Sequence, residues 1–252
     1  MFYKVLQIVK KEVINNKYFI ITFSNSDMAD QCHPGQFFRL KNQQQNFPIL
    51  PRPFSVYNIQ DGKISFLIKI IGESTKNLFE TKIGENISLH GPLGNGFKLV
   101  KNKKVLIVSG GIGYAPLNFL CDELKKADNE ITFFHGGKGS DDIFSKIIKI
   151  FTEDGSIGEK GLVTDRLEEF LSQNQIDIVY ACGPKIMMKK IYELCKIHNI
   201  GLQVSLEAIM ACGVGSCCGC TIKIFNENNE IIYKKVCKDG PVFDGYTVVW
   251  DE

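Results

Sequence analysis

Four cysteines near the C-terminal end constrain this chain more than any other feature. Four residues separate Cys212 from Cys217, two separate Cys217 from Cys220, and sixteen separate Cys220 from Cys237. The spacing is typical of a 2Fe–2S loop in which three thiolate ligands lie on one tight turn and the fourth returns from a distance. Glycines interspersed among the first three cysteines permit the positive φ angles and close approach that such a loop needs. We therefore predict that these four cysteines hold a 2Fe–2S cluster.

A structural zinc ion and a disulfide pair are the alternatives at these cysteines. Zinc sites usually combine two C-x2-C arms, and only Cys217 and Cys220 form such an arm here. Zinc binding would make the C-terminal part a redox-silent module for assembly. A disulfide framework is the poorer account because no secretory signal precedes it. We expect Cys218 to be a small packed thiol that points away from the cluster. We also expect Cys32, Cys121 and Cys195 to be buried structural residues.

The composition is that of a globular protein. Among 252 residues, 44% are hydrophobic and 23% are charged, and the net charge is +2. This near balance does not favour a nucleic-acid partner. No apolar stretch approaches the roughly 20 residues that cross a bilayer, and the first residues alternate like a strand. We therefore expect a cytoplasmic protein without a membrane segment.

The sequence divides into three regions. Residues 1–98 contain short segments rich in aromatic and β-branched residues, at 17–23, 36–40 and 63–70. Their period of two predicts an antiparallel β-barrel with one face of each strand buried. Residues 99–205 alternate apolar strands with amphipathic helices, which predicts a parallel α/β domain covered on both faces. Residues 206–252 are too few to bury much of a core, so we expect a small ferredoxin-like module stabilised by its metal centre.

Two motifs in the first region are candidates for flavin binding. In Arg52-Pro53-Phe54-Ser55, the arginine can clamp a pyrophosphate while Phe54 offers a flat face and Ser55 a hydroxyl. About twenty residues later, backbone amides and the Thr75 hydroxyl of Gly72-Glu73-Ser74-Thr75 can meet a phosphate. Taken alone, the second motif is better explained by an ordinary turn with Ser74 or Thr75 as the N-cap of a helix.

Two motifs in the second region are candidates for nicotinamide binding. Gly110-Gly111-Ile112-Gly113 follows an apolar strand and opens a helix, which points N–H groups and the helix dipole at a phosphate. It lacks the full G-x-G-x-x-G pattern. Cys182-Gly183-Pro184 follows a later strand, at the edge where ligands bind in open α/β sheets. The alternative for Cys182 is a buried cysteine at a strand end. No residue is assigned a catalytic role, and the four histidines are given none.

In this order, the motifs resemble those of the ferredoxin–NADP reductase superfamily. With the cysteine module at the end, the whole chain resembles the electron-transfer subunit of type B dihydroorotate dehydrogenase. The most specific stretches run from Leu206 to Cys217 and from Val236 to Phe243. The resemblance implies an oxidoreductase of pyrimidine biosynthesis with three cofactors, FAD, a 2Fe–2S cluster and NAD. It also implies a heterotetramer with a catalytic subunit that oxidises dihydroorotate at FMN and sends electrons through the cluster and FAD to NAD⁺.

The resemblance also assigns the FAD contacts of the family to residues of this chain. Ser74 stands where the family often has glycine, and Lys69 stands where arginine is common, which replaces a planar fork with a point charge. The implied contacts are Arg52, Pro53, Phe54, Ser55, Leu67, Ile68, Lys69, Ser74 and Thr75.

Related readings stay open at this point. The flavin subunit of NADH-dependent ferredoxin:NADP or sulfide dehydrogenase complexes has the same plan but typically an aspartate at the first cluster ligand, where this chain has Cys212. A self-sufficient NADH:acceptor reductase is another alternative. For the nicotinamide, Lys138 and Ser140 can meet a 2′-phosphate, whereas Asp141 and Asp142 would repel it. The family favours NAD.

Overall fold

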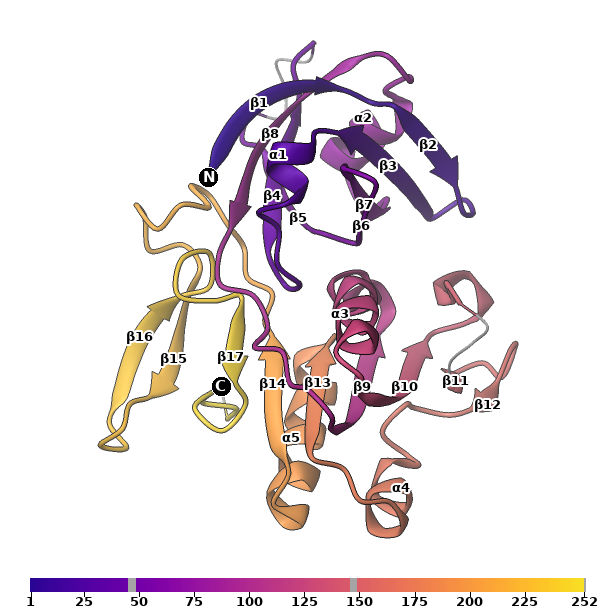
Figure 1. Cartoon of the computed structure of the whole chain (residues 1–252), viewed down its shortest axis with the longest axis vertical. Helices are drawn as coiled ribbons and strands as arrows, with labels where there is room; N and C mark the ends of the chain where they lie inside the picture. The colour runs from indigo at the N-terminus through magenta and orange to yellow at the C-terminus, as the bar shows by residue number, and fades with distance from the viewer. Residues whose placement is uncertain (45–48, 146–148, 252) are drawn as a thin grey trace.

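The first region forms two antiparallel sheets around a shared core. The structure, a computed structural model, describes residues 1–44, 49–145 and 149–251. One sheet has the strand order β1-β8-β4-β5, and the other has the order β2-β3-β7-β6 (Figure 1). The elements of this region are β1 (Phe2–Gln7), β2 (Lys10–Val13), β3 (Tyr18–Ser24), α1 (Ser26–Ala29), β4 (Phe37–Asn42), β5 (Arg52–Ser55), β6 (Asn58–Gln60), β7 (Lys63–Lys69), α2 (Glu73–Glu80) and β8 (Asn86–Leu93).

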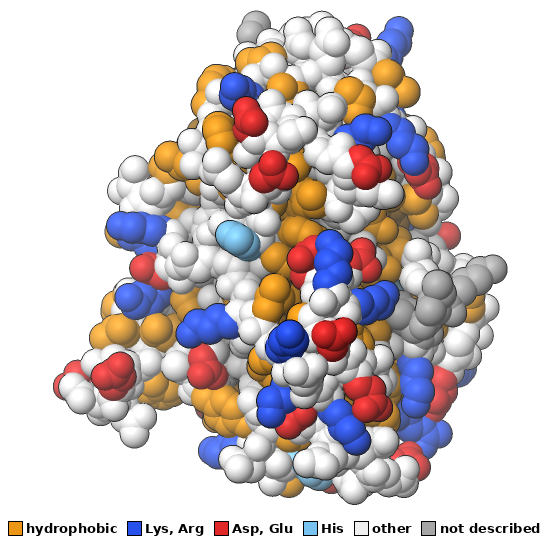
Figure 2. All heavy atoms as spheres, in the orientation of Figure 1, with side chains coloured by type: hydrophobic (Ala, Val, Ile, Leu, Met, Phe, Trp, Pro, Cys, Tyr) orange, Lys and Arg blue, Asp and Glu red, His pale blue; other side chains and the backbone are white. Residues whose placement is uncertain are grey.

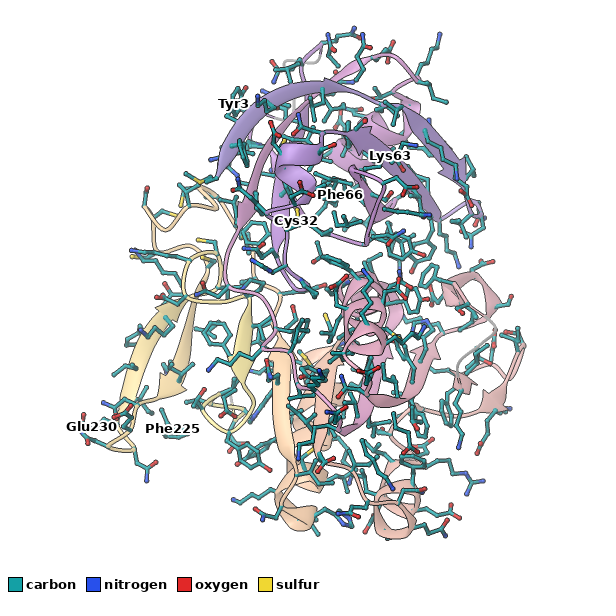
Figure 3. The ribbon with its side chains drawn as sticks, viewed as in Figure 1. Tyr3, Cys32, Lys63, Phe66, Phe225 and Glu230 are labelled. Atoms are coloured by element: carbon teal, nitrogen blue, oxygen red, sulfur yellow. The ribbon has the colours of Figure 1, made fainter. Side chains whose placement is uncertain are left out.

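Alternation of side chains along these strands builds the core, as the sequence predicts. Phe66 of β7 points into the interior (Figure 3), where its ring meets the edges of Phe23 and Phe38 at centroid distances of 6.1 and 5.6 Å. All three side chains are fully buried, and each contributes about 1.5–3 kcal/mol by leaving water. The antiparallel strands are confirmed, whereas closure of the two sheets into one barrel stays a prediction.

The second region is an α/β sheet in which consecutive strands run parallel. The sheet has the order β12-β11-β10-β9-β13-β14-β17, and only β17 runs antiparallel to its neighbour. Its elements are β9 (Lys104–Gly110), η1 (Gly111–Gly113), α3 (Tyr114–Lys126), β10 (Glu130–Gly137), η2 (Ser140–Asp142), β11 (Lys149–Thr152), β12 (Glu159–Lys160), α4 (Leu167–Gln173), β13 (Ile178–Cys182), α5 (Lys185–His198) and β14 (Gly201–Ser205).

Helices cover both faces of this sheet because its central strands are apolar on both sides. In β9, Val105 and Ile107 are buried on one face with the leucines of α3, whereas Leu106 and Val108 are buried on the other with α5. Figure 1 shows α3 on the side of the first region and α5 on the opposite side.

The third region shares the core of the second. It consists of β15 (Thr221–Phe225), β16 (Ile231–Lys235) and β17 (Val242–Asp244). The first two pair as a hairpin whose turn is closed by the Asn226 amide donating to the Glu230 carbonyl at 2.9 Å. Glu230 marks the hairpin tip in Figure 3. Because β17 pairs with β14, this short region adds one antiparallel strand to the edge of the neighbouring sheet. The strands within residues 99–205 pair in parallel, as predicted.

The exposed face in Figure 2 carries acidic and basic side chains in alternation, with apolar side chains between them. No single sign of charge dominates this face. In the described part of the chain, none of the helices has both the length and the apolar character needed to traverse a bilayer.

Candidate redox site

Among the described residues, strand β5 and the end of β7 each have one backbone edge without a neighbouring strand. The strand β5, which carries Arg52–Ser55, ends its sheet and pairs only with β4 on its other side. Strand β7 pairs with β6 only through Lys63–Ser65, so the edge at Leu67–Lys69 extends beyond that partner. The two strands lie next to each other, and α2 follows β7 directly. The predicted FAD contacts are thus brought together at the seam between the two sheets.

The side chains at this seam differ in what they can offer a ligand. All four residues of β5 are half-buried, which leaves each accessible. Arg52 donates from Nη1 to the Leu50 carbonyl at 3.1 Å. Leu67 and Ile68 are buried, so only their backbone groups can face a flavin.

The Thr75 side chain fastens the first turn of α2 to Gly72, the N-cap of that helix. Its Oγ1 accepts hydrogen bonds from the amides of Ile71 at 2.9 Å and Gly72 at 3.1 Å and donates to the Gly72 carbonyl at 2.9 Å. The hydroxyl is therefore already engaged, with only 7% of the residue exposed. The turn that enters a helix is confirmed, but the prediction of Ser74 or Thr75 as its N-cap was wrong: Gly72 is the N-cap, and Thr75 is the third residue of the helix. The backbone amides of the first turn remain the groups available to a phosphate.

The two nicotinamide motifs meet at the carboxyl ends of adjacent strands. Gly110 ends β9, and Cys182 ends β13, its parallel neighbour. The turns are in such close contact that a Cβ on Gly113 would overlap the carbonyl group of Cys182. A Cβ on Gly183 would come within 2.9 Å of the Gly110 amide nitrogen. The turn η1 also lies next to β7, so the nicotinamide motifs face the flavin seam.

Glu207, which was given no role from the sequence, lies near the nicotinamide motifs beside Cys182. Glu207 is exposed at the surface, but protein atoms surround enough of its carboxyl group to raise the pKa of that group. Burial, and next the charge of Glu207, raise the pKa of the Cys182 thiol. The thiol is therefore protonated at neutral pH, and the carboxylate lies beside it at the ends of β13 and β14. The stretch from Leu206 identified Glu207 as family-specific, but only the fold places it beside Cys182.

A buried carboxylate connects the first two regions. Asp142 accepts from the Tyr18 hydroxyl at 2.7 Å and from the Lys138 amide at 2.9 Å, and Lys69 Nζ lies 3.8 Å away. Burial opposes its ionisation, but these partners outweigh burial and lower the pKa of Asp142. Asp141 likewise forms an ion pair with Lys17 at 2.9 Å. From the sequence, both carboxylates were expected to repel a 2′-phosphate, whereas in the structure each is bonded to the first region.

His135 supports this connection, a role that the sequence reading missed. The residue is fully buried, with Nε2 2.7 Å from the Asp142 carbonyl and Nδ1 2.7 Å from Ser109 Oγ. Because the carbonyl can only accept, Nε2 carries the proton and Nδ1 accepts from the serine. Burial lowers the pKa of His135, which favours this neutral form. No sequence signal distinguishes it from the other histidines.

The cysteine loop supplies amide donors to its own sulfurs. The Cys217 amide donates to Cys212 Sγ at 3.3 Å, and the Gly215 amide donates to Cys237 Sγ at 3.2 Å. Amide hydrogen bonds, chiefly that of Cys217, lower the pKa of the Cys212 thiol to about 6. Burial raises the pKa of Cys237 to about 11. Amides that stabilise thiolates are what an iron–sulfur loop requires, so the residues present fit the predicted cluster.

Cys212 interacts with Cys217, and Cys237 interacts chiefly with Cys220, while the charge of Cys212 also acts on Cys237. Within residues 1–44, 49–145 and 149–251, no group of three or more His, Cys, Asp or Glu side chains converges as it would on a single metal ion. A 2Fe–2S cluster takes two protein ligands on each iron, so paired thiols suit it better than they suit one tetrahedral zinc. The ligand assignment itself stays a prediction.

The burial of the other cysteines agrees with expectation except at Cys218. Cys32, Cys121, Cys182 and Cys195 are buried. Cys218 is exposed, so the expectation of a packed thiol was wrong. Cys218 lies on the turn between the predicted ligands Cys217 and Cys220, and this turn directs its side chain toward solvent.

The loop before the second region anchors the segment that carries the fourth cysteine. The Asn95 amide donates to the Gly240 carbonyl at 2.6 Å, and Asn95 Nδ2 donates to the carbonyl of Asp239 at 3.0 Å. Asn95 also forms a bridge with Pro241. This loop therefore fixes Cys237 relative to the first region.

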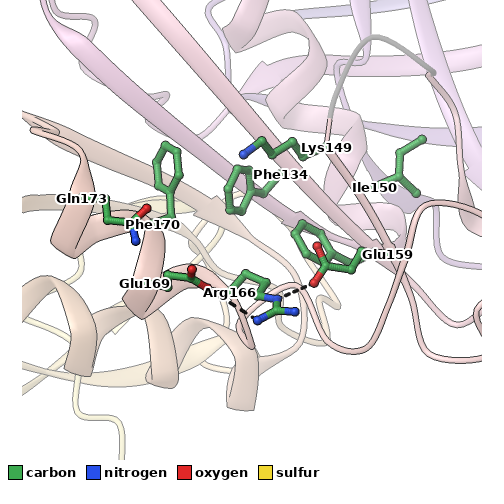
Figure 4. Close-up of a pocket in the computed structure, with 9 residues that line it drawn as sticks. Phe134, Lys149, Ile150, Glu159, Arg166, Glu169, Phe170 and Gln173 are labelled. Atoms are coloured by element: carbon green, nitrogen blue, oxygen red, sulfur yellow. Dashed lines mark hydrogen bonds and ion pairs between the residues drawn. The ribbon is translucent and has the colours of Figure 1, made fainter.

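A pocket of about 570 Å³ lies away from these motifs. Arg166 bridges Glu159 and Glu169 across its mouth, the second at 3.5 Å (Figure 4). No predicted site residue lines it, so we assign it no part in the redox site. Its lining residues are Phe134, Lys149, Ile150, Phe151, Glu159, Arg166, Glu169, Phe170 and Gln173.

Comparisons with known proteins cover both ends of the chain. Residues 5–97 match the oxidoreductase FAD-binding domain. Residues 207–249 match the iron-sulfur cluster binding domain of dihydroorotate dehydrogenase B. An oxidoreductase that binds FAD and an iron–sulfur cluster is thereby confirmed.

Solved structures share this architecture. The structure of an NADH-dependent reduced ferredoxin-NADP oxidoreductase superposes with a TM-score of 0.84 at 30% identity, over 98% of this chain and 90% of that one. A ferredoxin NADP⁺ reductase from Neisseria gonorrhoeae, with bound FAD and NADP, superposes with a TM-score of 0.65 over 78% of this chain and 91% of its own. At 15% identity, the second likeness concerns the fold alone.

Relatives over most of the chain carry one name, dihydroorotate dehydrogenase B (NAD(+)), electron transfer subunit. The protein of Caldanaerobacter subterraneus subsp. tengcongensis is 43% identical over 84% of this chain and 85% of its own length. That of Clostridium acetobutylicum is 39% identical over 88% of each chain. That of Desulforamulus reducens is 35% identical over 95% of each. The chain belongs to the family of dihydroorotate dehydrogenase B electron transfer subunits.

Proposed function

We propose that this chain passes electrons from the FMN of a dihydroorotate-oxidising subunit to NAD⁺, through a 2Fe–2S cluster and FAD. The observation that carries the proposal is the convergence of three sites on the first region. The flavin seam lies at β5 and β7, the turn η1 lies next to β7, and Arg39 of β4 bonds to the cysteine loop. A bound flavin exchanges a hydride with a nicotinamide and single electrons with a cluster, so it converts between the two kinds of carrier.

The residues of the chain would hold and orient these groups. The edges of β5 and β7 would bind the flavin, with the two sheets completing a barrel around the remaining core. The turns of Gly110–Gly113 and Cys182–Pro184 would place the nicotinamide against it. The three regions, 1–98, 99–205 and 206–252, would thus serve as FAD, nucleotide and cluster domains.

The partner would dock where the cysteine loop reaches solvent. Cys212 and Cys217 are half-exposed, whereas Cys220 and Cys237 are buried. Ile209, three residues before the first cysteine, is 90% exposed. An apolar side chain beside an accessible cluster suits a protein partner that receives or gives single electrons. We propose a heterotetramer of two such chains with two FMN-containing subunits.

For the nicotinamide we propose NAD. The relatives carry NAD(+) in their name. Comparing the oxidation rates of NADH and NADPH tests this choice.

Affinity purification from the native host, followed by flavin, iron and sulfide analysis, tests the main proposal. We expect FAD and a cluster in this chain and an FMN protein with it, in a complex whose mass fits two copies of each. Dihydroorotate-dependent reduction of NAD⁺ by the complex supports the proposal. Reduction driven by ferredoxin, or full activity of the chain alone, would assign it to another relay.

Substituting a predicted ligand separates the two halves of the relay. We expect Cys217→Ser to leave FAD content and NADH-to-dye reduction largely intact, because the flavin seam lies on other strands. Transfer to the partner should be lost. Cys218→Ser is the matched control, since its exposed thiol is not a predicted ligand. If Cys217→Ser still supported orotate formation with NAD⁺, the relay assignment would be wrong.

A further inference from the structure

Arg39 belongs to the first region, yet its side chain lies on the cysteine loop. Its Nη2 donates to the Ala211 carbonyl at 3.4 Å. The loop turns at Gly213 with a φ of 64°, and a Cβ there would stand 2.5 Å from Arg39 Cδ and 2.9 Å from Nε. The arginine stem is therefore seated on the backbone of the residue that follows the first cysteine.

The guanidinium also lies within electrostatic range of both cysteine pairs. Burial lowers the pKa of Arg39, and the charges of Cys212 and Cys237 raise it. These two thiols belong to different pairs, so the cation lies near both halves of the predicted cluster. Arginine keeps its charge at any physiological pH. Because Arg39 is half-buried, water screens this charge less than it would on an open surface.

The backbone of Arg39 belongs to the strand that pairs with the predicted flavin motif. On β4 it stands opposite Pro53 of β5, within the predicted flavin motif. The other cations at the loop come from the cluster module itself, where Lys235 Nζ donates to the Gly215 carbonyl at 2.7 Å. Arg39 thus connects the flavin strand to the loop through a single side chain.

We propose that Arg39 is a positioning residue that holds the cysteine loop against the flavin strand and favours the reduced cluster. The inference rests on the proposed function, since it requires a cluster at these cysteines. Reduction by one electron, taken from reduced flavin or from the partner, adds one negative charge to the cluster. A fixed cation nearby lowers the free energy of that state and so raises the reduction potential.

Redox titration of the purified, full-length protein, followed by electron paramagnetic resonance of the reduced cluster, tests the proposal. For Arg39→Gln we expect the ratio of reduced to oxidised cluster at a fixed potential to fall about tenfold, which is a midpoint about 59 mV lower for a one-electron couple. Arg39→Lys keeps the charge and should keep most of the potential. Lys41→Gln is the matched control, because it removes one charge from the same face of β4.

Each possible result of these titrations either supports or overturns the proposed role of Arg39. A midpoint in Arg39→Gln equal to that of Lys41→Gln overturns the proposal. If Arg39→Gln loses its iron, Arg39→Lys decides instead: an unchanged potential supports the role of the charge, and a tenfold fall in the ratio overturns it. Wild-type protein without iron and sulfide would refute the proposed function itself, whereas a cluster present in wild type with no shift in Arg39→Gln refutes this inference alone.

Discussion

At the scale of single residues, the nicotinamide site depends on a contact between two backbones. Gly113 is the N-cap of α3 and Cys182 ends β13, and no side chain separates them. The atoms that a Cβ would meet are the carbonyl group of Cys182 and the Gly183 amide. Backbone atoms at the end of a buried strand cannot rotate aside as a side chain can. The absence of a side chain at Gly113 therefore sets the distance between the two turns.

Gly113→Ala should separate these turns. We expect a stability loss of about 1–3 kcal/mol from the overlap and a fall in NADH-to-dye reduction of about tenfold to a hundredfold from the displaced nicotinamide site. Gly201→Ala, in the same sheet, is the control, because its Cβ would meet neighbours no closer than 3.6 Å. Thermal melting and steady-state kinetics measure both effects. If Gly113→Ala had the melting temperature and the NADH-to-dye rate of the wild type, the contact between the two turns would not have the proposed importance.

At the scale of elements, α2 shows how one motif can serve a helix and a ligand with different atoms. The Thr75 hydroxyl is occupied by the backbone of Ile71 and Gly72, while Ser74 is half-buried beside it. A buried hydroxyl with three backbone partners has a structural role that does not require FAD.

Thr75→Val and Ser74→Ala should therefore behave differently. We expect Thr75→Val to cost about 1–2 kcal/mol in the protein with and without FAD, because the hydrogen bonds of the hydroxyl to Ile71 and Gly72 are lost in both. Ser74→Ala should lower stability only when FAD is bound. Melting temperatures of the FAD-loaded and FAD-depleted forms distinguish the two. A Thr75→Val effect confined to the FAD-loaded form would assign its hydroxyl to the cofactor instead.

Much of the fold was predictable from local patterns. Alternating aromatic residues marked β3 and β7, and leucines at helical spacing marked α3, because burial imposes a period on each element. The cluster was predictable because its ligands lie close together in sequence. The contact of Arg39 with the loop, the pairing of β17 with β14 and the Tyr18–Asp142 bond join distant segments. Such contacts leave no local pattern and follow only from the packed structure.

At the scale of the whole molecule, the first two regions meet through buried polar groups rather than a purely apolar surface. Tyr18 comes from β3, and Asp142 from η2, whose backbone is held by His135. In the neutral form of His135, Nε2 donates to the Asp142 carbonyl and Nδ1 accepts from Ser109, and burial opposes the charged form. The contact that orients the nucleotide domain against the flavin seam is therefore sensitive to acid.

His135→Gln tests that sensitivity. Burial lowers the pKa of His135 below its ordinary 6.5, so the unfolded chain binds a proton that the folded protein refuses. The contribution of neutral His135 to the free energy of unfolding is complete above pH 6.5. It falls as the pH drops toward the lowered pKa of the folded protein, by up to about 1.4 kcal/mol per pH unit. Glutamine cannot titrate, so the variant should be less stable at pH 7.5 and approach the wild type at pH 5. Melting temperatures across this range measure the gap, and a gap that stays constant would show that the neutral imidazole does not hold the two regions together.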